Sequence, residues 1–189
     1  MPGEQLETDV KQHLIYIKSL RIFPRSEARA LVEEWLQERE FAKPRNSMLE
    51  FLGLDHAMSH EDMLSRLEQA VYPVSRVPIK TEDHLNYLSS LRIFDKVGDE
   101  DWARVRKQSC IQAWLNFTGL SSHGRKVEES VKKALGLGEL NSESVGRMLQ
   151  EAAEKGVSWR HESREKGTRE NRLPRFLGGR KTNKSRRDV

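Results

Sequence analysis

The segment HLIYIKSLRIF at residues 13–23 returns as HLNYLSSLRIF at residues 84–94. Eight of the eleven positions are identical when His13 is aligned with His84. Self-similarity at a fixed spacing is typical of chains built from repeated structural units. We therefore predict two tandem related helical units, at residues 9–72 and 81–136, each of which begins with one copy of this segment.

Two weaker matches follow in the same order along the chain, at slightly shorter spacings. They pair residues 48–54 with 114–120, and residues 63–71 with 127–135. Chance could produce one such match, but three in one order favour a duplication. The join at residues 73–80 contains Pro73 and Pro78, which restrict the backbone to extended conformations, so it is predicted to be a linker.

The spacing of apolar residues predicts helices throughout both units. Tyr16, Leu20 and Phe23 fall at positions i, i+4 and i+7, which places them on one face of a helix. Pro24 and Pro44 are expected to end the first two helices. Because no segment alternates apolar and polar residues as a half-buried strand does, the predicted fold class is all-α. The remaining expectations are an additional helix at 140–156, and disorder at residues 1–8 and in a basic tail at 157–189.

The composition limits both the core and the location of the protein. Of the 189 residues, 36% are hydrophobic and 33% are charged, against about 45–50% and 25% in typical globular domains, which excludes a large core of several layers. No apolar run approaches the roughly 18 residues of a transmembrane helix, and the acidic, polar N-terminus does not resemble a secretory signal, so no membrane partner is expected. A single cysteine, Cys110, fits an intracellular, reducing compartment, cytoplasmic or nuclear.

Positive charge is concentrated at the C-terminal end of the chain. Residues 157–189 contain eleven Lys or Arg and four Asp or Glu, a net charge of +7, which leaves 22 basic and 25 acidic residues, a net charge of −3, before them. Such a distribution favours a polyanionic partner, and RNA is favoured over DNA. The predicted nucleic-acid-binding residues of the tail are Arg160, Arg164, Lys166, Arg169, Arg172, Arg175, Arg180, Lys181, Lys184, Arg186 and Arg187.

Arg21 and Arg92, which occupy the same place in the two repeated segments, complete this candidate set. In one interpretation they are matched phosphate contacts, with the repeated His and Tyr residues beside them. In the other, which we favour, the repeated Tyr residues belong to the core, and the arginines lie at its edge with their aliphatic carbons against apolar surface. The repeated residues could also line a contact between the two units or between two copies of the chain.

Residues with catalytic or metal-binding chemistry form no convincing pattern. His56 and His60 are one helical turn apart, but no third ligand is evident, so a metal site is not expected. Nearby basic residues could lower the pKa of Cys110, although a role as a small buried side chain is favoured. Residues 178–182 lack the glycine spacing of a phosphate-binding loop. We therefore expect no enzymatic activity, no cofactor and no metal.

The leading hypothesis is a non-enzymatic nucleic-acid-binding protein, largely independent of base sequence. Its size and charge would suit a viral or mobile-element accessory factor that coats or sequesters RNA. The alternative is a helical protein–protein adaptor that uses exposed Trp102 and Trp114 as its interface and the tail as a nuclear localisation signal. Self-association and a protein partner remain open.

Overall fold

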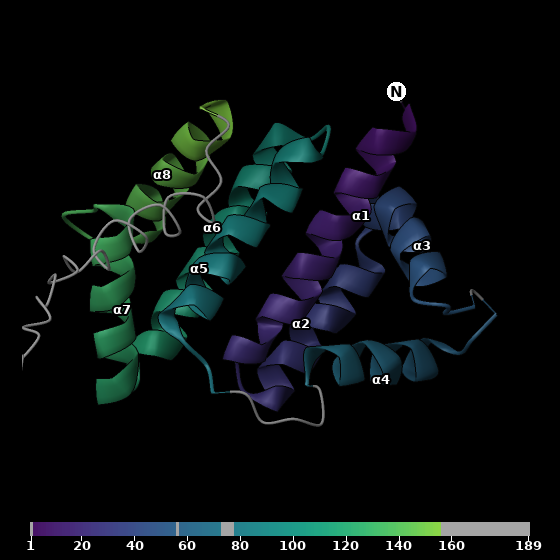
Figure 1. Ribbon diagram of the computed structural model, residues 1–189, viewed down its shortest axis with the longest axis horizontal. Coiled ribbons are helices and arrows are strands. Elements are labelled where there is room, and N and C mark those ends of the chain that lie inside the picture. The colour runs from purple at the N-terminus through teal and green to yellow at the C-terminus, as the bar shows by residue number, and fades with distance from the viewer. Residues whose placement is uncertain (1, 56, 73–77, 156–189) are drawn as a thin grey trace, which may run out of the picture. The chain divides into compact units, whose positions relative to one another are not determined.

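The structure, a computed structural model, describes residues 2–55, 57–72 and 78–155, with side chains from Asp9 onward. Within these ranges the chain is all-α and contains no strand, as the sequence predicted. Figure 1 shows α1 to α4 on one side and α5 to α8 on the other. The α-helices are α1 (Pro2–Ser19), α2 (Arg25–Gln37), α3 (Ala42–Phe51), α4 (His60–Val71), α5 (Thr81–Ser90), α6 (Glu100–Gly119), α7 (Ser122–Leu135) and α8 (Ser142–Glu154), and the 3-10 helices are η1 (Leu20–Ile22), η2 (Arg39–Phe41) and η3 (Leu91–Lys96).

Local sequence signals set most of the helix ends. The side chains of Ser59, Asp99, Ser121 and Asn141 each accept a hydrogen bond from a backbone N–H in the first turn of the helix that follows. Such caps satisfy amide groups that a helix leaves without partners at its start. At the other end of α7, Gly136 adopts a left-handed conformation with φ of 66°, which glycine reaches without steric cost.

Three local expectations were wrong. Pro44 does not end a helix but lies in the first turn of α3, where its missing N–H has no helical acceptor to lose. Residues 2–8, expected to be disordered, belong to α1, and their proline and acidic residues suit the start of a helix. The helices of the repeated segments also tighten into η1 and η3 over their last turns.

The two repeated segments pack against each other as an antiparallel pair, α1–η1 against α5–η3. Ion pairs join opposite ends of the pair, between Lys96 and Asp9 at one end and between Arg21 and Asp83 at the other. Within the pair, the hydroxyl oxygens of Ser19 and Ser90 lie 3.3 Å apart.

The same pair of segments carries much of the buried core. The rings of Tyr16 and Tyr87 stack with their centroids 6.4 Å apart, and both side chains are buried. The apolar residues of the two halves form a continuous cluster, in which Phe41 contacts Phe94 and Phe23 contacts Tyr87. By contacts between residues, Met1–Val157 forms one compact unit, so the predicted units 9–72 and 81–136 share a core.

Gly124 of α7 lies against the backbone of α6 near Thr118. A Cβ atom at this position would lie 1.8 Å from the backbone oxygen of Thr118, and backbone cannot move aside as a flexible side chain does. We therefore expect Gly124→Ala to lower the free energy of unfolding by about 3 kcal/mol, as overpacked cores do. Chemical denaturation would measure the loss. Gly138→Ala is the control, since a Cβ there meets nothing within 4 Å, and an equal loss in both variants would contradict the steric explanation.

Candidate nucleic-acid interface

Each repeated segment begins with a buried histidine that is bonded to a tryptophan. The indole N–H of Trp35 donates to Nδ1 of His13 at 3.0 Å, and that of Trp114 donates to Nδ1 of His84 at 2.9 Å. Burial is the largest cause that lowers the pKa of each histidine from 6.5 to about 4. Both imidazoles are therefore neutral at pH 7, and their charge is not available to bind phosphate.

The tyrosines and serines of the segments also serve the interior. The hydroxyl of Ser19 donates to the backbone oxygen of Tyr16 at 2.7 Å, and Ser90 makes the same bond to Tyr87 at 2.6 Å. The hydroxyl of Tyr87 donates to the backbone oxygen of Cys110 at 3.2 Å. These matched contacts support the interpretation of the repeat as a shared structural unit, and they place its polar residues at the contact between the two halves.

The contacts also correct one detail of the sequence alignment. Trp114 bonds to His84 as Trp35 bonds to His13, so Trp114 is the counterpart of Trp35. The weaker sequence match had paired Trp114 with Met48 instead. The two halves differ here because the first contains the two helices α2 and α3, whereas the second contains the single 20-residue helix α6.

Arg21 is one of the two candidate phosphate contacts in residues 1–156, which we call the helical body. Its side chain already binds a carboxylate. Its guanidinium donates to Oδ1 of Asp83 at 2.7 Å, and both side chains are largely covered. The other carboxylate oxygen of Asp83 accepts the backbone N–H of Lys80 at 2.8 Å. A phosphate at Arg21 would have to displace Asp83 from a contact that joins η1 to α5.

Arg92 does not lie beside Arg21, because the segments run in opposite directions. Arg21 is opposite Asp83, and Arg92 follows Asp83 by nine positions. At the rise of α- and 3-10 helices, this is a separation of roughly 15 Å along the axis. The structure thus brings the two arginines to opposite ends of one helix pair, so they do not form one shared phosphate site.

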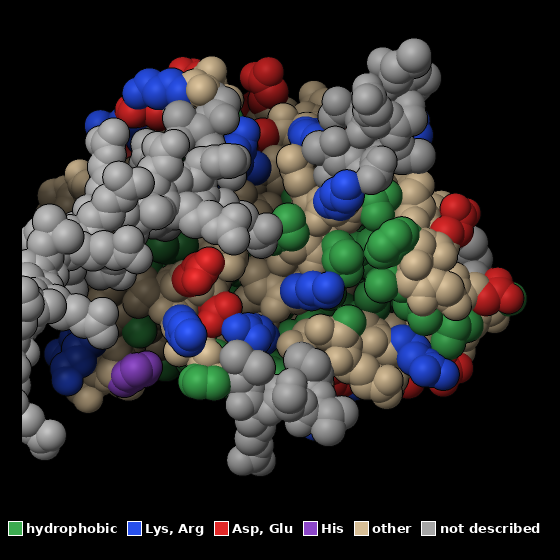
Figure 2. All heavy atoms as spheres, viewed as in Figure 1, with side chains coloured by type: hydrophobic (Ala, Val, Ile, Leu, Met, Phe, Trp, Pro, Cys, Tyr) green, Lys and Arg blue, Asp and Glu red, His purple; other side chains and the backbone are tan. Residues whose placement is uncertain are grey.

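Many cations of the body are held by neighbouring carboxylates. Glu68 accepts hydrogen bonds from Arg25 and Arg29, and the bond from Arg25 is the main cause that lowers the pKa of Glu68. Arg106 donates to Glu34 at 2.9 Å. On the face drawn in Figure 2, Lys and Arg side chains are interspersed with Asp and Glu, and no continuous basic surface is visible there.

The eleven candidate residues of the tail, from Arg160 to Arg187, lie outside the described residues. Their assignment as nucleic-acid-binding residues stays a prediction from the sequence.

The two tryptophans that motivated an adaptor do not form an exposed surface. Trp114 is fully buried, and Trp102 is partly buried with its ring against Phe41 and Phe94. The alternative function therefore loses the interface that the sequence had suggested for it.

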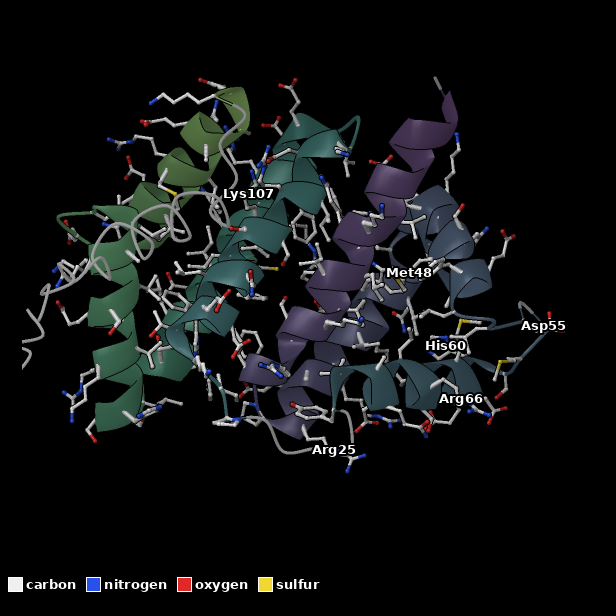
Figure 3. All side chains as sticks on the ribbon, viewed as in Figure 1. Arg25, Met48, Asp55, His60, Arg66 and Lys107 are labelled. Atoms are coloured by element: carbon white, nitrogen blue, oxygen red, sulfur yellow. The ribbon has the colours of Figure 1, made fainter. Side chains whose placement is uncertain are left out.

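Residues considered for catalysis or metal binding are not assembled into a site. Cys110 is buried, and this burial raises its pKa to about 11, so the group is a thiol and not a nucleophilic thiolate at pH 7. Figure 3 shows Asp55 at the outer tip of the α3–α4 loop and His60 at the start of α4. His56 lies outside the described residues, within which no group of three or more His, Cys, Asp or Glu could hold a metal ion.

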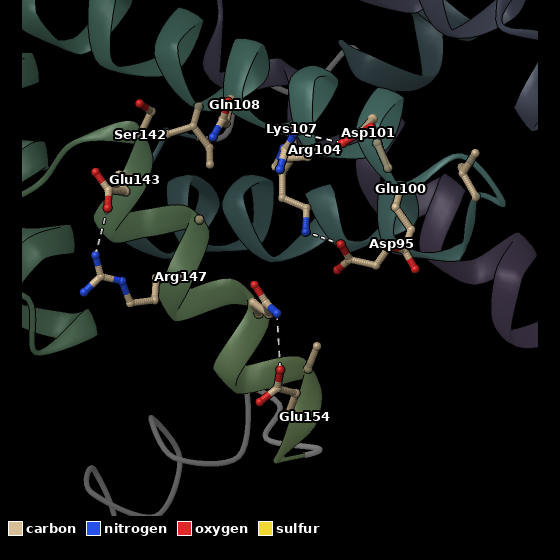
Figure 4. A pocket seen from close by; sticks show the side chains of 16 residues that line it. Asp95, Glu100, Asp101, Arg104, Lys107, Gln108, Ser142, Glu143, Arg147 and Glu154 are labelled. Carbon is tan, nitrogen blue, oxygen red and sulfur yellow. Dashed lines mark hydrogen bonds and ion pairs between the residues drawn. The ribbon is translucent and has the colours of Figure 1, made fainter.

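A groove of about 640 Å³ lies between α6 and α8, with η3 at one end. Polar contacts along its rim, drawn as dashed lines in Figure 4, join Lys107 to Asp95, Arg104 to Asp101, Arg147 to Glu143 and Gln150 to Glu154. Sequence reasoning did not find this groove, because its two walls lie far apart along the chain.

Comparisons with known proteins give no further guide to function. No protein-family model matches the chain, and neither a curated protein nor a solved structure matches it. In the described part of the chain, no helix has the length and apolar character needed to cross a membrane.

Proposed function

We propose that this protein is a non-enzymatic RNA-binding protein in which residues 157–189 provide most of the affinity and the helical body holds this segment. The observation that carries the proposal is the division of charge, +7 in residues 157–189 against −3 in the rest of the chain. Cations that neutralise phosphates release condensed counterions, and this release favours binding to any nucleic acid.

The structure of the helical body supports the proposal that residues 157–189 provide most of the affinity. Arg21 is paired with Asp83, Arg25 with Glu68, and Arg29 with both Glu61 and Glu68, so each of these guanidinium groups has a carboxylate partner. Arg92 is separated from Arg21 by the antiparallel arrangement. Residues 1–156 therefore offset their 22 Lys or Arg with 25 Asp or Glu, whereas residues 157–189 have eleven Lys or Arg against four Asp or Glu in one short segment.

Single- and double-stranded RNA and DNA should bind the full-length protein with an affinity that falls steeply as salt is raised. If about six phosphates are neutralised, the slope of log K against log salt is near −4 for single strands and near −5 for duplex DNA. Fluorescence anisotropy at several salt concentrations would measure these slopes. Full-length protein with no salt-dependent affinity for any of the four nucleic acids would refute the proposal.

A truncated protein of residues 1–156 locates the binding site. All of the described helices lie within residues 2–155, so the truncation keeps every contact among them. We expect the truncated protein to lose at least a hundredfold in affinity at about 0.1 M salt. The matched control is full-length Arg92→Gln, which removes one dispersed cation of the body and should change affinity less than threefold. Equal affinity of the truncated and full-length proteins would place the site on the helices.

A further inference from the structure

The outward side of α7 carries three cations that no described carboxylate neutralises. Arg125, Lys126 and Lys133 are all exposed, and we call them the α7 cations. Among the described residues none of the three forms an ion pair, whereas the neighbouring Lys132 pairs with Glu129 at 3.7 Å. Within the described part of the chain, the charge of the α7 cations is therefore open to an external anion.

Positive charge also dominates α7 as a whole. The helix has four Lys or Arg against two Glu, a net charge of +2. Oε1 of Glu128 accepts the hydroxyl of Thr118, so this carboxylate is half-buried and directed toward α6. Glu129 pairs with Lys132 on its own helix. The two carboxylates of α7 thus have other partners than the α7 cations.

The opposite side of α7 is packed, which fixes the direction in which the α7 cations face. Val131 is fully buried, and Gly124 is buried against the backbone of Thr118. Lys126 and Lys133 are seven residues apart, close to two full turns, so they lie on one side of the helix. The α7 cations extend over about 12 Å of the helix axis, which corresponds to three or four nucleotides in one strand of a duplex. Each cation can therefore meet a different phosphate of one backbone.

The matching helix of the first half lacks these cations. The alignment of residues 63–71 in α4 with 127–135 in α7 pairs the buried residues Leu67 and Val131. In the same alignment, the positions of Arg125, Lys126 and Lys133 are taken by Glu61, Asp62 and Gln69. These three side chains are exposed on α4. The packing of such a helix therefore does not require cations on its outward side, and their presence on α7 needs another explanation.

A nucleic-acid backbone fits this surface better than an anionic membrane does. A helix that lies on a membrane buries its apolar side among the lipids. The apolar side of α7 is already packed in the core, where Val131 is fully buried and Val127 and Leu135 are partly buried. Phosphates need only the exposed cations, and Lys and Arg clustered along a helix are typical of nucleic-acid-binding surfaces.

We infer that the α7 cations form a second RNA-binding surface, at which Arg125, Lys126 and Lys133 contact the phosphate backbone of RNA without reading its bases. The inference rests on the proposed RNA binding and adds a defined place on the helical body to it. Two linked contacts with one RNA bind it more tightly than either contact does alone. This surface contributes less than residues 157–189, because it has three cations against their eleven.

RNA binding by a triple variant of the full-length protein tests the inference. Arg125→Gln, Lys126→Gln and Lys133→Gln together remove the α7 cations and keep residues of high helix propensity. With a single-stranded RNA of about 20 nucleotides, we expect affinity to fall at least tenfold at about 0.1 M salt. The slope of log K against log salt should become less steep by about 2, because three phosphate contacts are lost. Fluorescence anisotropy would measure both quantities.

The matched control is the triple variant Lys18→Gln, Lys43→Gln and Arg66→Gln, which also removes one arginine and two lysines. These three cations are exposed and form no ion pair among the described residues. They lie on three different helices of the first half, α1, α3 and α4, and Figure 3 shows Arg66 on α4. Because they do not share one helix face, the control should change affinity less than threefold. A further variant, Arg125→Lys, Lys126→Arg and Lys133→Arg, keeps the charges of α7 and should bind as the wild type does.

Equal affinity of the two glutamine variants, with a wild type that binds RNA, would overturn the α7 surface and leave the proposed function standing. A wild type without affinity for RNA would overturn both. If the α7 variant keeps its affinity for RNA but loses binding to vesicles that contain phosphatidylserine, the surface is a membrane contact and the assignment to RNA is wrong.

Discussion

Acidification from pH 7 to pH 4 is expected to lower the free energy of unfolding by about 6 kcal/mol, because two buried histidines must then accept protons. His13 and His84 each use Nδ1 to accept the indole N–H of a tryptophan. A protonated imidazole has an N–H at both nitrogens, so Nδ1 can no longer accept. Protonation therefore breaks a buried hydrogen bond and places a charge in the core.

The charged groups around each histidine do not cancel the free-energy cost of protonating the buried imidazole. Burial lowers the pKa of His13 most strongly, Asp9 acts to raise it and Lys96 acts to lower it. Burial is again the main cause at His84, where Asp83 acts to raise the pKa and His123 to lower it. The result in both cases is a pKa of about 4 in the folded protein against 6.5 for the ordinary side chain.

The sign of the pH effect follows from these values. Between pH 6.5 and pH 4 the unfolded chain binds protons at these positions and the folded chain does not, so the stability contribution is complete above pH 6.5 and is lost as the pH falls to 4. The difference between the two pKa values corresponds to about 3 kcal/mol for each histidine. The slope near pH 5 should approach about 2.7 kcal/mol per pH unit, since two groups titrate together.

Urea denaturation at a series of pH values would measure this slope. The control is the double variant His13→Asn with His84→Asn, whose amide oxygens can still accept from the indoles but do not titrate. We expect the double variant to be less stable at pH 7 and nearly insensitive to pH between 5 and 7. The same slope in the wild type and the double variant would assign the acid sensitivity to other groups.

Trp114→Ala is expected to cost about 5 kcal/mol of stability at pH 7. Trp114 is fully buried, and truncation of a buried large aromatic residue to alanine costs about 3–5 kcal/mol through lost burial and the cavity that remains. The substitution also leaves Nδ1 of His84 without its donor inside the core, which adds about 1–3 kcal/mol. Trp35→Ala should have a similar effect, because it removes the equivalent bond to His13.

Chemical denaturation of three single variants would test this prediction. Trp102→Ala is the matched control, since Trp102 is only partly buried and should cost about half as much. Trp114→Phe retains most of the ring but not the N–H, so it isolates the hydrogen bond at about 1–2 kcal/mol. A loss for Trp114→Ala no larger than that for Trp102→Ala would show that the His–Trp pairs are not major contributors to the core.

The sequence predicted the helical class, because this class depends on local chemistry. The spacing of Tyr16, Leu20 and Phe23 indicates one buried helix face, and Ser59 marks a helix start. The prediction for Pro44 was wrong, because Pro44 lies in the first turn of α3. Proline has the same fixed backbone angle and the same missing N–H whether it follows one helix or begins the next, so the sequence alone does not separate the two cases. The candidate site was less predictable, because Arg21 meets its partner Asp83 from 62 positions away.

The amino-acid sequence by itself determined that the chain forms helices, that a helical segment occurs twice and that its C-terminal segment is basic. These properties depend on side-chain spacing, capping groups and charge, which act over short stretches of chain. Only the tertiary structure decided that the two repeated segments pack antiparallel, that their histidines accept from Trp35 and Trp114, and that Arg21 and Arg92 lie apart. It also formed the groove between α6 and α8, because the burial of apolar faces selects which distant elements meet.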